Sequence, residues 1–201
     1  IVMGIRQVKI SPSILAADQA RLGEQVREAT QAGADYIHVD VVDGRFAPNL
    51  TVGPAVVEAI RPYTHLPLDV HLMIVEPERL IPDFAKAGAS IITVHAEACP
   101  HLHRVVFLIK ELGAKAGVAI NPATPLAVIE EVLADVDRVL LMTVNPGYAG
   151  QELIRSVLKK LTQARRLLDE QGLDVELGVD GGVNARNAAD VVQAGARLLA
   201  V

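Results

Sequence analysis

Residues 78–95 read ERLIPDFAKAGASIITVH, and this stretch contains the unit from which the fold is built. Over 78–87, apolar side chains recur at the i, i+3 and i+4 spacing of a helix, whereas 91–95 is a short β-branched run typical of a buried strand. Gly88 separates the two, at a position where the left-handed backbone that ends many helices favours glycine. The stretch therefore predicts a helix that ends at a glycine and leads directly into a strand.

The same unit recurs along the chain. Strands are predicted over 8–11, 36–40, 68–72, 91–95, 115–120, 139–143, 175–179 and 198–201. Helices are predicted over 19–32, 78–87, 102–112 and 154–171, and the glycines that end a helical pattern are Gly33, Gly88, Gly113, Gly172 and Gly195. Eight strands that alternate with helices predict an α/β fold, in which right-handed crossovers close one parallel sheet into a TIM (β/α)8 barrel.

The main alternative is an open, doubly wound sheet. Such sheets usually carry a glycine fingerprint after the first strand, but residues 11–15 read Ser-Pro-Ser-Ile-Leu. The composition fits a parallel sheet covered by helices, because 51% of the residues are hydrophobic, only 3% are aromatic and Trp is absent. We therefore favour the barrel.

Charge and cysteine content exclude several classes of partner. The formal charge of −5 is mildly acidic and contains no long run of either sign, so nucleic acid is not expected as a partner. Cys99 is the single cysteine, so no intrachain disulfide forms, and a lone thiol fits a reducing compartment. No apolar stretch reaches the roughly 20 residues of a membrane span, so we expect a cytoplasmic protein without a membrane partner.

Polar residues gather where predicted strands end. His38 and Asp40 share one face at the end of the second strand, His71 lies at the end of the third, and Asp180 follows the seventh. Active sites of TIM barrels lie at this end of the strands. Two imidazoles and two carboxylates suit one zinc, iron, manganese or cobalt ion better than magnesium. The alternative is that each histidine is a satisfied core residue and each aspartate a helix cap.

Two glycine-rich turns follow the sixth and seventh strands, NPGYAGQ at 145–151 and DGGVN at 180–184. Turns of this kind expose backbone N–H groups that bind phosphate, and in many barrels the phosphate site lies in the last loops. Ordinary loop glycine is the alternative.

Five blocks together resemble the ribulose-phosphate 3-epimerase family. They are SPS at 11–13, HVDVVDGRFAPN at 38–49, DVHLM at 69–73, MTVNPGYAGQ at 142–151 and VDGG at 179–182. The resemblance runs from Val8 to the end of the chain. It implies a phosphate-binding TIM barrel with one divalent metal ion that interconverts D-ribulose 5-phosphate and D-xylulose 5-phosphate. It also implies a place in the pentose phosphate pathway or the Calvin cycle, and a homo-oligomer, either a dimer or a hexamer.

The resemblance also implies roles for individual residues. His38, Asp40, His71 and Asp180 match the family's metal ligands, and Asp40 and Asp180 also match its pair of acid/base carboxylates. Ser13 matches a serine that contacts the substrate. Met73 and Met142 match methionines that lie beside the reacting carbons. The full set expected at the substrate is Ser13, His71, Met73, Met142, Gly147, Tyr148, Ala149, Gly150, Asp180, Gly181 and Gly182.

Epimerisation at C3 removes a hydrogen beside a carbonyl and returns one to the opposite face, so it needs an acid/base group on each side. We expect Asp40 and Asp180 to be these groups, with roles that depend on the direction of reaction. A metal ion bound to the C2 and C3 oxygens would stabilise the cis-enediolate. His95 and Glu97 also end a strand, and we expect them to support the ligands rather than to join them.

The chain departs from the family at Val42, Ala47 and the pair Tyr148-Ala149, where the family usually has Met, Val and Phe-Gly. The family's phosphate loop after the eighth strand is not found before Val201, so we expect one barrel domain over 1–201 that lacks the final loop and helix. The loop over 41–53 either covers the substrate or is a plain connection. Two further alternatives are an epimerase of a hexulose 6-phosphate such as allulose 6-phosphate, and a barrel that binds phosphate ligands without catalysis.

Overall fold

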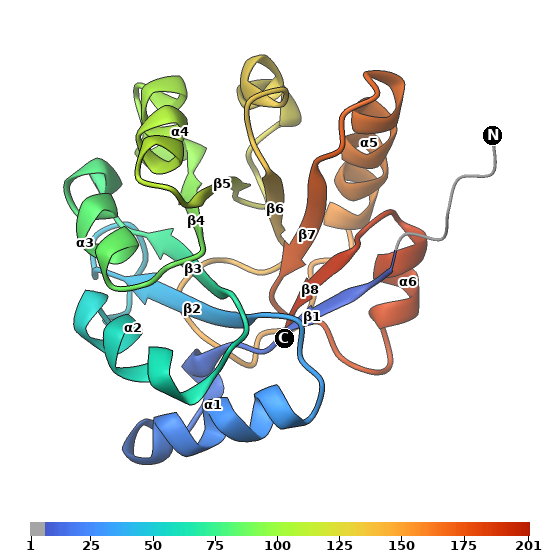
Figure 1. Ribbon diagram of the computed structural model, residues 1–201. Helices are drawn as coiled ribbons and strands as arrows, with labels where there is room; N and C mark the ends of the chain where they lie inside the picture. The colour runs from blue at the N-terminus through green and yellow to red at the C-terminus, as the bar shows by residue number, and fades with distance from the viewer. Residues whose placement is uncertain (1–6) are drawn as a thin grey trace.

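Eight parallel strands form one sheet in the computed structural model, which describes residues 7–201 (Figure 1). The strands follow one another around the sheet in the order β1-β8-β7-β6-β5-β4-β3-β2. They are β1 Lys9–Ser11, β2 Ile37–Val42, β3 Leu68–Met73, β4 Ile91–His95, β5 Lys115–Ile120, β6 Arg138–Met142, β7 Glu176–Asp180 and β8 Leu198–Ala200. The predicted strands are thus all present, with ends that differ by no more than a few residues.

Hydrogen bonds between the two outer strands of this order bring the ring close to closure. The backbone N–H of Asp35 donates to the carbonyl of Ile10 at 2.9 Å, and that of His38 donates to the carbonyl of Pro12 at 2.9 Å. An isolated parallel bridge joins Ser13 to His38. These contacts join the end of β1 to β2, so the predicted α/β TIM barrel is confirmed.

Helices lie outside the ring and follow most strands (Figure 1). They are α1 Leu22–Gln31, α2 Pro54–Ile60, α3 Ile81–Lys86, α4 Leu102–Glu111, α5 Val157–Glu170 and α6 Ala188–Gln193. The five glycines predicted to end helical patterns all have positive φ angles, between 66° at Gly172 and 123° at Gly195. Two 3-10 turns, Leu126–Val128 and Glu130–Val132, connect β5 to β6. No helix within residues 7–201 has both the length and the apolar character of a membrane span.

The two faces of the strands have different chemistry. Outward residues such as Val39, Val70 and Ile92 are fully buried beneath the helices and belong to one large apolar cluster. Inward positions on β2, β3 and β4 carry polar groups instead. The buried polar residues of these three strands are His38, Asp40, Asp69, His71, Thr93 and His95. A polar interior in this part of the barrel positions the site described next.

Candidate metal and proton-transfer site

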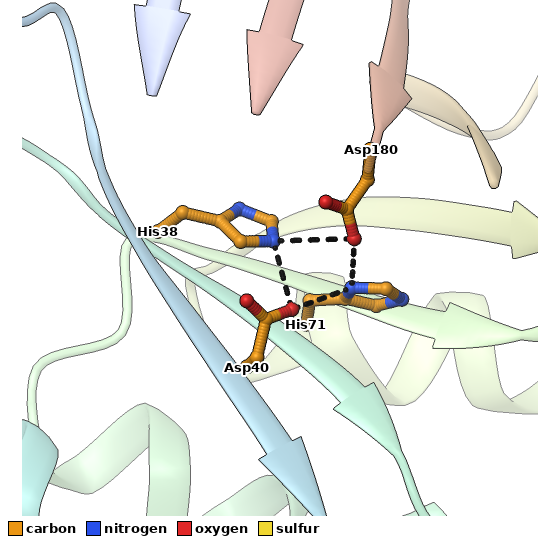
Figure 2. Close-up of side chains that lie close together, drawn as sticks. All are labelled: His38, Asp40, His71 and Asp180. Carbon is orange, nitrogen blue, oxygen red and sulfur yellow. Dashed lines mark hydrogen bonds and ion pairs between the residues drawn. The ribbon is translucent and has the colours of Figure 1, made fainter. Parts of the chain in front are cut away.

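Four side chains converge inside the barrel (Figure 2). β2 carries His38 and Asp40, β3 carries His71, and Asp180 is the last residue of β7. One ligand atom from each lies within 4.8 Å of the other three. All four residues are buried. The structure therefore brings the four predicted residues together, although only Asp180 ends its strand, and their role as metal ligands stays a prediction.

One nitrogen of each imidazole faces the carboxylates. His71 Nδ1 lies 3.2 Å from Asp40 Oδ1 and 3.2 Å from Asp180 Oδ2. His38 Nε2 lies 3.2 Å from Asp40 Oδ1 and 3.8 Å from Asp180 Oδ2. Two nitrogen and two oxygen donors thus surround one small volume, as the dashed lines of Figure 2 show.

The charges of these groups favour a bound cation. Burial alone would raise the pKa of Asp40, but the imidazoles of His38 and His71 outweigh it and hold this pKa well below its usual range. Burial would lower the pKa of His38, but Asp40 and Asp69 raise it well above its ordinary value. The two carboxylates therefore need positive charge beside them, and without a metal ion the imidazoles supply it as protons.

A divalent ion fits this donor set. His38 Nε2 is buried and makes no hydrogen bond of good geometry within the described chain, although it faces the carboxylates. A metal ion would use its lone pair and neutralise both aspartates. Mixed nitrogen and oxygen donors suit zinc, iron, manganese or cobalt, so the residues present fit a metal of this class.

Asp69 holds the far side of His38. Its Oδ2 lies 2.9 Å from His38 Nδ1, and β3 is in register with β2 so that His38 and Asp69 are directly opposite each other. Burial would raise the pKa of Asp69, but Arg138 and His38 lower it to about 2. An ionised Asp69 accepts a hydrogen bond from the Nδ1–H of His38, which leaves the Nε2 lone pair of His38 free for the metal. Asp69 was not predicted as a site residue, although Asp69 and His71 show the same two-residue spacing as His38 and Asp40.

His95 and Glu97 lie outside the four-residue cluster. The Nε2 atoms of His71 and His95 are 2.9 Å apart, so His95 contacts the side of His71 that faces away from the carboxylates. Burial lowers the pKa of His95 to about 4, which leaves it neutral at physiological pH. Both residues thus lie where a supporting role requires.

Ser13 orients one of the two aspartates. Its hydroxyl donates to Asp40 Oδ2 at 2.5 Å, while Oδ1 of the same carboxylate faces the imidazoles. Each oxygen of Asp40 therefore has a different neighbour. One belongs to the metal cluster and the other lies toward the pocket that Ser13 lines.

A cavity of about 330 Å³ adjoins the cluster. Its size matches sites for small molecules. Asp40 and Asp180 reach it, whereas His38 and His71 are fully buried. Of the residues predicted at the substrate, those that line the cavity are Ser13, Met73, Met142, Gly147, Tyr148, Ala149, Gly150, Asp180, Gly181 and Gly182. Their contact with a substrate stays a prediction.

The two glycine-rich turns meet at this cavity. Their glycines have positive φ angles, including 130° at Gly147 and 70° at Gly182. A Cβ atom on Gly182 would lie 2.5 Å from the backbone nitrogen of Leu153, so a side chain there would collide with the preceding loop. The turns therefore depend on glycine both for their backbone conformation and for their close approach.

The loop after β2 is joined to the loop after β6. Asn49 Nδ2 donates to the carbonyl of Gly147 at 2.7 Å, and the Tyr148 hydroxyl donates to the carbonyl of Pro48. The hydrogen bond to Pro48 needs the hydroxyl of Tyr148, which the phenylalanine expected at this position would lack. The 41–53 segment is therefore attached to the turn that lines the cavity.

Comparison with known proteins gives a consistent result. The model of a family described as "Ribulose-phosphate 3 epimerase family" matches residues 9–201. The ribulose-phosphate 3-epimerase of Bacillus subtilis (strain 168) is 60% identical over 193 residues, which cover 96% of this chain and 89% of that protein. The ribulose-5-phosphate-3-epimerase, chloroplastic, of Arabidopsis thaliana is 58% identical, covering 94% and 68%. The ribulose-phosphate 3-epimerase of Escherichia coli (strain K12) is 51% identical, covering 96% and 86%.

Solved structures with a similar fold include a mutant tryptophan synthase alpha-subunit from Pyrococcus furiosus. It aligns with a TM-score of 0.73 over 98% of this chain and 87% of the other, at 16% identity. At this identity the similarity supports the barrel fold alone.

Proposed function

Because the chain belongs to the ribulose-phosphate 3-epimerase family and is an epimerase, we propose that it interconverts D-ribulose 5-phosphate and D-xylulose 5-phosphate with Asp40 and Asp180 as its proton-transfer groups. The observation that carries this proposal is the position of the two carboxylates. Each contributes one oxygen to the metal cluster, and both residues line the adjoining cavity. A sugar bound there would lie against both.

The carboxylate oxygens that face away from the imidazoles are placed for the proton transfer. Asp40 Oδ1 and Asp180 Oδ2 face the imidazoles, which leaves Asp40 Oδ2 and Asp180 Oδ1 for the substrate. The two side chains enter from opposite sides of the cluster in Figure 2. One carboxylate removes the proton from C3, and the other, in its acid form, returns a proton to the opposite face. Which aspartate acts as the base depends on which epimer is bound.

The surrounding residues set the conditions for this step. When bound, a divalent ion at the four donors supplies Lewis-acid stabilisation to negative charge on neighbouring substrate oxygens. Ser13 fixes Asp40 Oδ2 toward the cavity, so this oxygen keeps one direction for accepting a proton. Met73 and Met142, each 2% exposed, place apolar thioether chains at the cavity wall and exclude water there.

The phosphate group would bind at the glycine-rich turns. Residues 147–150 and 181–182 line the cavity on the β6 and β7 side, and glycine-rich turns of this kind can expose backbone N–H groups. Such N–H groups bind anions without a charged side chain. The expected homo-oligomer and the expected cytoplasmic location remain predictions.

Exchange of solvent deuterium into C3 of the substrate tests the mechanism. Asp40→Asn and Asp180→Asn should each abolish net epimerisation, because neither amide can take up or deliver the proton. If both variants incorporate deuterium at C3 at the parent rate, the two-carboxylate mechanism is wrong. A strong preference of the parent for D-allulose 6-phosphate over D-ribulose 5-phosphate would replace the five-carbon substrate with the six-carbon one.

A further inference from the structure

The imidazoles of His71 and His95 meet edge to edge. Their Nε2 atoms are 2.9 Å apart, while the ring centroids are 5.1 Å apart and the ring planes differ by only 20°. This is the arrangement of one N–H···N hydrogen bond that lies in the plane of both rings. One of the two nitrogens must therefore carry the proton and the other must accept it.

Glu97 decides the direction of this bond. Its Oε2 lies 3.1 Å from His95 Nδ1, and an ionised carboxylate can only accept. A neutral His95 that donates from Nδ1 carries its lone pair on Nε2, and this nitrogen accepts from the Nε2–H of His71. The remaining nitrogen of His71, Nδ1, faces the two carboxylates, and when a metal ion displaces its proton the lone pair of Nδ1 is directed at the metal.

The carboxylate of Glu97 is itself held in place by two donors. Its Oε1 accepts from the backbone N–H of Asn121 at 2.7 Å and from the hydroxyl of Thr124 at 2.5 Å. The backbone of this loop is fixed in turn from α5, because the Lys160 ammonium donates to the carbonyls of Asn121, Pro122 and Thr124 at 2.9, 2.7 and 2.6 Å. Oε1 of Glu97 thus has two donors, and Oε2 remains for His95.

We propose that Glu97, acting through His95, is the positioning residue that sets the tautomer of His71 and so presents Nδ1 of His71 to the metal. This inference rests on the proposed metal site. It assigns His71 a bond direction that follows from the carboxylate of Glu97, which can only accept. His38 has a separate support in Asp69, so the two imidazole ligands are oriented independently.

The substitution Glu97→Gln tests the inference, because it keeps the shape of the side chain and reverses the direction of the hydrogen bond between residue 97 and His95 Nδ1. The backbone N–H of Asn121 can only donate, so the amide oxygen must face it. The amide NH2 group then faces His95 Nδ1, which must accept. His95 is thereby forced to carry its proton on Nε2, opposite the Nε2–H that His71 needs when its Nδ1 binds a metal ion.

Two measurements follow from this reversal. Nitrogen-15 NMR of the histidine rings should show His95 protonated at Nδ1 in the metal-free parent and at Nε2 in metal-free Glu97→Gln. Titration with Zn²⁺ alone, in competition with a chromophoric chelator, should show a loss of affinity of about 10- to 100-fold, the usual range for supports of metal ligands. A merely structural role of Glu97 would leave the tautomer of His95 unchanged.

Two control variants separate this effect from general damage. Glu111→Gln makes the same change at an exposed carboxylate on α4, and both its His95 tautomer and its Zn²⁺ affinity should equal those of the parent. Thr124→Val removes one donor to Glu97 but keeps the carboxylate, so His95 should keep its proton on Nδ1. A change of tautomer in Thr124→Val would contradict the proposed role of the carboxylate charge.

The outcomes are distinguishable from a failure of the proposed function. If the parent binds Zn²⁺ and Glu97→Gln binds it equally well with the parent's tautomer, the positioning role is wrong while the metal site stands. If the parent itself binds no Zn²⁺, both are wrong.

Discussion

Arg138 Nη1 lies 2.5 Å from Asp69 Oδ1, and this ion pair is buried inside the barrel. Arg138 is 2% exposed and Asp69 is fully buried. The other oxygen of Asp69 contacts His38, so the ion pair connects the start of β6 with a metal ligand. Glu176 Oε2 also accepts from Arg138 Nη2 at 2.6 Å, and the charge of Glu176 is balanced by Lys9, whose Nζ lies 2.8 Å from Oε1.

Removing the guanidinium should destabilise the fold strongly. In Arg138→Met the carboxylate of Asp69 is left buried without its ion-pair partner, and breaking a buried pair in this way costs about 3–5 kcal/mol. Urea unfolding at pH 7 measures the free energy of unfolding. Arg104→Met, on the exposed face of α4, is the matched control and should lie within about 0.5 kcal/mol of the parent. Equal stability of the two variants would contradict the importance of the ion pair.

Tyr148→Phe should weaken substrate binding without unfolding the barrel. The change removes only the hydroxyl that donates to Pro48, and with it one of the two bonds between the loops beside the cavity. We expect KM for the sugar phosphate to rise roughly two- to tenfold, which corresponds to the loss of one hydrogen bond. Steady-state kinetics measure the effect. Tyr63→Phe, at a 38% exposed tyrosine outside the cavity, should leave KM unchanged.

Binding of Zn²⁺ should release protons at neutral pH. The neighbouring carboxylates, against the effect of burial, raise the pKa of both His38 and His71 above the ordinary value of 6.5. Raised pKa values favour the protonated imidazoles in the metal-free chain, so a metal ion must displace protons from them. Calorimetry in buffers of different ionisation enthalpy counts them. A release of no protons at pH 7 would contradict this charge state.

The stability of the metal-free chain should fall as the pH rises above neutral. A group with a raised folded-state pKa contributes stability that is fully present below its unfolded value and is lost as the pH rises through the folded value. For His38 and His71 this loss begins above about pH 6.5. The Zn²⁺-loaded chain has already given up these protons, so its advantage in melting temperature should grow with pH. A constant difference between pH 6 and pH 9 would be the contrary result.

Cys99 should react with thiol reagents only when the chain unfolds. Burial, with smaller effects from Glu78 and Glu97, raises the pKa of this thiol to about 12, and the residue is only 4% exposed. The thiolate is the reactive form, so labelling with a chromogenic disulfide at pH 8 should be negligible in the native state. Full labelling should appear across the urea transition, whereas rapid labelling of the native chain would contradict the burial of Cys99.

Periodicity and the order of elements were sufficient to predict the barrel. Strands buried on both faces appear as uninterrupted apolar runs, and each glycine that ends a helix lies close before the next strand. The helix α2 was not predicted, because seven residues with only Val57 and Ile60 buried give too short a pattern. The segment between β5 and β6 likewise forms 3-10 turns that leave no helical periodicity.

The ligand cluster could be predicted because all parallel strands of a barrel end on one side. The supports of the ligands could not, because they depend on the register between strands. Asp69 contacts His38 since these residues are directly opposite each other on β3 and β2, and sequence spacing within one strand does not give that alignment. Arg138 is more remote still, since it lies at the beginning of β6 and reaches Asp69, the second residue of β3, across the barrel interior.

The neighbouring strands β2, β3 and β4 carry three of the four metal donors together with Asp69, His95 and Glu97 close by, whereas Asp180 comes from β7. The chain could therefore be cut in the connection between β5 and β6 into two fragments that contribute very different numbers of residues to the metal site. The first fragment would hold nearly the whole metal centre, and the second would add a single ligand. Recovered epimerase activity on mixing the two would then report reassembly of the barrel, since the first fragment lacks one of the two proton-transfer carboxylates.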